Sequence, residues 1–110
     1  MMPRKVRVLL LVRWPVGGIR TFIRYVYRNF DPERYAFCVV GPDHPEMDVL
    51  ENDLSGLSFE FKRLSPNPSA VEILLVTTRL LFKGGFDLIH SHGFTSALCA
   101  ALPAAVTRTP

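Results

Sequence analysis

The stretch VRVLLLV at residues 6–12, followed by RWPVGG at 13–18 and IRTFIRYV at 19–26, decides the fold of this chain. The first run is apolar apart from one arginine, which indicates a short strand buried on both faces, as in a parallel sheet. Proline and glycine then break the strand. From residue 19 the apolar positions recur every three or four residues as far as Phe30. This spacing predicts an amphipathic helix that ends before Asp31-Pro32.

The rest of the chain repeats this alternation of strand and helix. The segments with a strand pattern are residues 36–40, 58–64 and 87–91, and the segments with a helix pattern are 45–54, 69–82 and the stretch from about residue 95. The strand at 58–64 is the most polar and is predicted at an edge of the sheet. Ser69 with Glu72 forms a capping-box pattern, and Pro103 is expected to kink or end the last helix. The pattern predicts an α/β fold: a Rossmann-like, doubly wound parallel sheet of about four strands in the order 3-2-1-4.

Length and composition limit the classes of protein to consider. With 110 residues, 48% of them hydrophobic, the chain is expected to form one domain, residues 1–110. The net charge of +3 is too small to indicate a nucleic-acid partner. It fits an ordinary basic surface, an anionic ligand or an acidic membrane surface. Cys38 and Cys99 are expected to be buried free thiols, without the spacing of a zinc site.

The chain shows no segment with the length and hydropathy of a membrane span, and residues 3–12 make a poor signal peptide. We therefore expect a cytoplasmic protein, with peripheral membrane contact left open as an alternative.

Two loops form the candidate site, because ligands of doubly wound sheets bind where the carboxyl ends of the first and fourth strands meet. In the first loop, positions 16–18 hold no Ser, Thr, Asp or Asn to cap the helix start. Its amides are then open to an anion such as a phosphate, which would also explain a cation in the first turn. The alternative is a tight turn with water on the amides. The predicted anion-binding residues are Gly17, Gly18, Ile19 and Arg20.

The second loop follows a strand in which His90 and His92 point to the same face. His90 is expected to be a hydrogen-bonded histidine of the core. His92 stands at the carboxyl end, where it can hydrogen-bond a ligand hydroxyl. The predicted pocket residues are Arg13, His92, Gly93 and Phe94. A metal site is not expected, since the two histidines lack a third ligand.

The segments VRVLLLVRWPVGGIRTFIRYV (6–26) and FDLIHSHGFTSALCAAL (86–102), in this order and at this separation, resemble the N-terminal domain of family 4 glycosyltransferases. These are retaining enzymes of the GT-B fold. The resemblance implies a chain that is the incomplete N-terminal half of such an enzyme. The reaction is transfer of a sugar from a nucleotide-sugar donor to a glycan or lipid-linked acceptor, as in cell-envelope polysaccharide biosynthesis. It also implies a C-terminal nucleotide-sugar domain, no cofactor beyond the substrate, no required metal and no nucleic acid.

The resemblance further implies roles for the two loops. Gly17 and Gly18 would reach the donor diphosphate, with Ile19 and Arg20 beside them, and the pocket residues of the second loop would face the acceptor. The family's next strand, its T-x-H segment and its paired glutamates have no counterpart in these 110 residues. No catalytic residue is therefore assigned, and we expect this chain alone to be inactive. The apolar strand at 87–91 would keep an open outer edge, so we also expect the isolated chain to self-associate.

Two other functions remain open at this point. One is a non-catalytic Rossmann-like module that binds a phosphate-bearing ligand or a partner subunit. The other is a nicotinamide-dependent oxidoreductase, which needs a third glycine in the first loop and an acid after the second strand. The loop lacks that glycine, and Asp43 is the acid that stands nearest to the required place.

Overall fold

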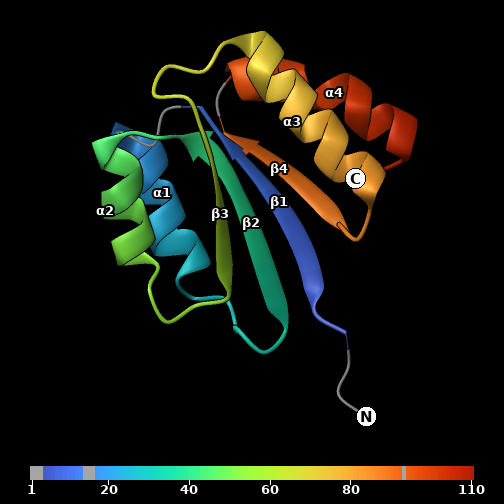
Figure 1. Ribbon diagram of the computed structural model, residues 1–110. Helices are drawn as coiled ribbons and strands as arrows, with labels where there is room; N and C mark the ends of the chain where they lie inside the picture. Colours follow the sequence, from blue (N-terminus) through green and yellow to red (C-terminus); the bar gives the residue numbers. More distant parts are fainter. Residues whose placement is uncertain (1–3, 14–16, 93) are drawn as a thin grey trace.

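The computed structural model describes residues 4–13, 17–92 and 94–110, in which strands and helices alternate (Figure 1). The elements are β1 (Val6–Val12), α1 (Gly17–Tyr27), β2 (Tyr35–Pro42), α2 (Pro45–Asp53), β3 (Phe59–Leu64), α3 (Ala70–Lys83), β4 (Leu88–His92) and α4 (Phe94–Thr107). The predicted α/β class is confirmed.

The sheet is entirely parallel, with the strand order β3-β2-β1-β4, as predicted. The apolar run of β1 lies in the middle, between β2 and β4. Leu9, Leu10 and Leu11 have no exposed surface, which explains why this strand lacks the polar alternation of β3. β3 forms one edge of the sheet and β4 the other.

Two helices cover each face of the sheet (Figure 1). On one face, Val8, Leu10 and Val12 pack with residues of α1 and α2, namely Ile23, Tyr27, Met47 and Leu50. On the other face, Leu9 and Leu11 pack with residues of α3 and α4, namely Ile73, Leu81, Cys99 and Ala100. This arrangement is a Rossmann-like double winding. With right-handed crossovers, the connections that run from β1 to β2 and on to β3 place their helices on one face, and the connection that returns from β3 to β4 places its helix on the other.

Three local predictions need correction. α1 ends at Tyr27, before Phe30, although the Phe30 side chain still packs against the core. Pro103 does not end α4, which continues to Thr107 with the proline ring buried. Ser69 caps α3 as predicted, its Oγ accepting from the Glu72 N–H at 3.1 Å. The Glu72 carboxylate, however, accepts from the N–H and Oγ of Ser65 instead of completing the capping box.

The outer edge of β4 is open along most of its length. One backbone bond covers its start: the Ile89 N–H donates to the Pro110 carbonyl at 2.7 Å. Beside this edge, α4 exposes the apolar side chains of Leu98, Leu102 and Val106. His90 is also exposed, so its predicted burial in the core is wrong, because it lies on an edge strand. The predicted hydrogen bond is present, and its partner is the Tyr27 hydroxyl.

Candidate functional site

The two strands that lead into the predicted loops lie side by side, and both end at the carboxyl edge of the sheet. β1 and β4 pair directly, and Val12 lies opposite His92 in their register. α1 begins after β1 and α4 begins after β4, so the amino ends of both helices lie at this edge. Trp14 to Val16 and Gly93 lie outside the described residues, and Phe94 is described here only as the first residue of α4.

The start of α1 faces open space at Gly18. Among residues 4–13, 17–92 and 94–110, a Cβ atom built on Gly18 would meet no heavy atom within 4 Å. Ile19, the next predicted residue, is half-buried and packs against the core on the α1 face of the sheet. The first turn of α1 therefore has one open side, at Gly18, and one packed side.

Arg20 is held by a neighbouring helix. Its guanidinium forms an ion pair with the carboxylate of Glu46, in the first turn of α2. This contact gives a reason within the protein for a cation near the amino end of α1, where it opposes the helix dipole. The sequence pattern alone had suggested an anionic ligand for this cation, because Glu46 is 26 residues away and local spacing does not relate the two.

Arg13 directly follows β1 and is half-buried. Its positive charge acts on Cys99 of α4, whose thiol pKa is raised by burial and partly lowered again by Arg13. The side chain thus lies on the α4 side of the sheet, whereas His92 points to the α1 side. The predicted pocket residues Arg13 and His92 flank the carboxyl edge from opposite faces.

His92 lies in a cluster of rings between β4 and α1. Its side chain is 8% exposed. The Tyr27 Oη atom, at the end of α1, is 3.3 Å from His92 Nε2 and also hydrogen-bonds His90 Nδ1. The two imidazole centroids are 4.3 Å apart, and the Phe22 ring lies 5.5 Å from that of His92. The cluster thus joins a buried histidine to an exposed one through a tyrosine hydroxyl.

Burial sets the charge of this cluster. It lowers the pKa of His92 from 6.5 to about 4, with a smaller contribution from the nearby charge of His90. Burial also raises the pKa of Tyr27 above its usual range. Both groups are therefore neutral at neutral pH, and they act as hydrogen-bonding groups rather than as charges.

Tyr27 and Phe22 are the residues of this site that sequence reasoning missed. Tyr27 stands four positions after Ile23, which is fully buried, so helical spacing places its ring on the buried face of α1. A tyrosine at such a position needs a partner for its hydroxyl. The sequence therefore indicated that the Tyr27 hydroxyl has a hydrogen-bond partner. Only the pairing of β4 with β1 identifies the partners as His90 and His92.

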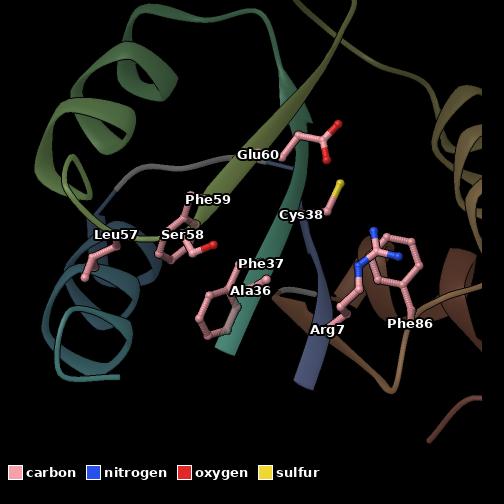
Figure 2. A pocket seen from close by; sticks show the side chains of 9 residues that line it. All are labelled: Arg7, Ala36, Phe37, Cys38, Leu57, Ser58, Phe59, Glu60 and Phe86. Carbon is pink, nitrogen blue, oxygen red and sulfur yellow. The ribbon is translucent and has the colours of Figure 1, made fainter. Parts of the chain in front are cut away.

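A hollow lies at the opposite, amino-terminal end of the sheet and has a volume of about 250 Å³ (Figure 2). Arg7, Cys38, Glu60 and Phe86 are among the residues that line it. The Arg7 guanidinium lies 4.6 Å from the centre of the Phe86 ring and donates to the Gly85 carbonyl at 3.2 Å. These contacts fasten the start of β1 to the turn before β4. The polar lining of this hollow is thus explained by structural contacts, and the hollow is remote from the ligand-binding edge expected for this fold.

Another hollow, of about 430 Å³, lies between α1 and residues of β1, β2 and β4. Its lining is largely apolar and includes Val26, Phe30, Tyr35 and Leu88, and it reaches Tyr27 and His90. An apolar groove thus leads toward the ring cluster from the amino end of β4.

In the part of the chain that the structure describes, no group of three His, Cys, Asp or Glu side chains could hold a metal ion. Within the same ranges, no helix has the length and hydropathy needed to cross a bilayer. No protein-family model matches this chain, and a comparison with curated proteins found no match.

Proposed function

We propose that this chain is the N-terminal, acceptor-side portion of a family 4 glycosyltransferase, which transfers a sugar from a nucleotide-sugar donor with retention. The observation that carries the proposal is the position of Gly18 and His92. They belong to the two segments that bear the resemblance. His92 ends β4, and Gly18 lies in the first turn of α1, the helix that follows the paired strand β1. In Rossmann-like sheets this edge is where nucleotide ligands bind.

The open space at Gly18 supports a role in donor binding. The main chain of α1 can approach a diphosphate there, because no atom of the described residues occupies the space that a side chain would fill. The ion pair with the Glu46 carboxylate offsets part of the positive charge of Arg20. We therefore assign the donor contact mainly to the amides of the first turn and only secondarily to the Arg20 side chain.

Neutral His92 supports a role in acceptor binding. A neutral imidazole can exchange hydrogen bonds with a sugar hydroxyl without the desolvation cost of an ion. In the proposed enzyme, Arg13 and the segment after His92 complete the acceptor pocket. The proposed compartment is the cytoplasm, where nucleotide-sugars are the donors.

The test is a charge placed at the open position. Gly18→Asp should abolish sugar transfer in the protein encoded by the complete gene, because it puts a carboxylate where the diphosphate binds. It should not harm folding: the added Cβ meets no atom of the described part of the chain within 4 Å, and the helix dipole favours an acidic residue in the first turn. Ser55→Asp adds the same charge in the exposed loop before β3, at the other end of the sheet, and serves as the matched control.

Transfer of a radiolabelled sugar from uridine and guanosine diphosphate sugars is the readout. Full transfer by Gly18→Asp would remove this loop from the donor site. Binding of a nucleoside diphosphate without any transfer by the unmodified protein would instead favour a non-catalytic phosphate-binding module.

A further inference from the structure

The Tyr27 hydroxyl lies between two imidazole nitrogens and has a single proton to share. Its oxygen hydrogen-bonds His90 Nδ1 and lies 3.3 Å from His92 Nε2. A hydroxyl donates one hydrogen bond and can accept others. Tyr27 therefore donates to one histidine and accepts from the other.

Chemistry decides between the two directions. A neutral histidine side chain intrinsically favours the proton on Nε2, and a hydrogen bond to one ring nitrogen fixes the state of the other. If His92 carries its proton on Nε2, it donates to Tyr27, and Tyr27 donates to His90 Nδ1. Both histidines then hold their favoured tautomer, and every group in the chain of three has a partner. The reverse direction forces His92 into the less favoured tautomer.

We propose that Tyr27 is a positioning residue that makes His92 a hydrogen-bond acceptor for a ligand hydroxyl. With Nε2 engaged by Tyr27, Nδ1 is the ring nitrogen left to meet a ligand, and in this tautomer it presents a lone pair. A lone pair attracts an alcohol or sugar hydroxyl and repels a phosphate oxygen. The inference rests on the proposed function only for the identity of that hydroxyl, which would belong to the sugar acceptor.

The same hydrogen-bond network can carry a proton away from the ligand hydroxyl as that hydroxyl reacts. The ligand O–H bond breaks and its proton joins His92 Nδ1, while the oxygen keeps the electron pair and uses it to bond the anomeric carbon of the donor sugar. The bond from that carbon to the diphosphate breaks, and the nucleoside diphosphate leaves with its electron pair. The Nε2 proton of His92 passes to Tyr27, and the original Tyr27 proton passes to His90 Nδ1. The positive charge thus ends on His90, which is exposed, and not on His92, which is 8% exposed.

A proton added to His90 should reverse the direction of both hydrogen bonds of Tyr27. His90 Nδ1 then donates to Tyr27, the Tyr27 proton turns toward His92 Nε2, and the proton of His92 moves to Nδ1. In the described part of the chain, the titratable groups that contact His92 include Tyr27 from α1 and His90 from its own strand. A change of tautomer at His92 that requires the Tyr27 hydroxyl is therefore the signature of this linkage.

The experiment is a pH titration of the ¹⁵N-labelled chain, with long-range ¹H–¹⁵N spectra of the imidazole rings. In the unmodified chain at about pH 8, His92 Nδ1 should resonate as an unprotonated nitrogen and Nε2 as a protonated one. The two resonances should move in opposite directions as the pH is lowered. Tyr27→Phe keeps the ring and its packing but should uncouple His92 from His90. Tyr35→Phe removes a hydroxyl from the neighbouring strand and should behave like the unmodified chain.

His90→Gln replaces an exposed side chain and supplies a second test if Tyr27→Phe does not fold. In this variant, His92 should keep one tautomer at every pH above the pKa of His92 itself. A proton on His92 Nδ1 at pH 8, or coupling that survives in Tyr27→Phe or His90→Gln, would overturn the proposal.

The class of ligand is tested with two probes at equal ionic strength, methyl α-glucoside and inorganic phosphate. The glucoside should shift the His92 Nδ1 resonance and phosphate should not. A shift with phosphate alone, or with neither probe, refutes the assignment of a hydroxyl ligand. None of these measurements needs sugar transfer, so failure of the glycosyltransferase proposal would be seen separately from failure of this one.

Discussion

Acidification should destabilise this fold through His92, at a pH higher than the range in which its carboxylates titrate. Burial lowers the pKa of folded His92 from 6.5 to about 4. Between these values the unfolded chain binds a proton that the folded chain does not. The contribution of His92 to stability is therefore complete above about pH 6.5 and is lost as the pH falls toward 4.

The size of the effect follows from that pKa difference. A lowering from 6.5 to about 4 corresponds to roughly 3 kcal/mol, at 1.36 kcal/mol for each tenfold change. A domain of this size has a total stability of about 5–15 kcal/mol, so the loss should be easy to measure. Hydrogen bonds lower the pKa of Asp87, mainly through the Arg7 N–H, and of Glu72, mainly through Ser65. Both acids weaken the fold only below their ordinary range near 4, which separates them from His92.

Urea unfolding followed by circular dichroism at pH values from about 7 to 4 is the assay. His92→Gln keeps a polar side chain but cannot titrate, so its free energy of unfolding should fall much less over this range, even if its stability at pH 7 is lower. Equal slopes for the two proteins would show that His92 is not held neutral by burial, and the reasoning would fail.

Four further outcomes are expected. Gly41→Ala should cost about 1–3 kcal/mol in urea unfolding, because the new Cβ would collide with a methionine side chain and lie 2.9 Å from the Val12 carbonyl oxygen. Ser69→Ala should cost about 1 kcal/mol in the same assay by removing the cap of α3. Burial, with a smaller contribution from a nearby glutamate, raises the pKa of Cys38 to about 11, so iodoacetamide at pH 8 should alkylate it about 100-fold more slowly than an unfolded cysteine. Leu102→Lys should reduce self-association in light scattering, because it charges the exposed apolar side of α4.

The sequence alone determined the elements of the fold and their order in the sheet. The near-continuous apolar run at 6–12 is suited to a strand with a neighbour on each side and both faces buried. The polar alternation at 58–64 is suited to an edge strand. Strands and helices alternate along the chain, and the connections between parallel strands are right-handed. These two rules exclude most orders of the strands, so the order 3-2-1-4 could be predicted. For the same reason, the sequence also indicated that the loops after β1 and β4 would meet at one edge.

The tertiary structure alone decided which side chains meet. Tyr27 and His92 are 65 residues apart, and Arg20 and Glu46 are 26 apart. Periodicity assigns a residue to a face of its own element, but it does not say how one helix is rotated and shifted against a strand distant in sequence. That fit depends on the packing of many side chains together. It placed a tyrosine hydroxyl on His92 and a carboxylate on Arg20, and both contacts change what the predicted site can bind.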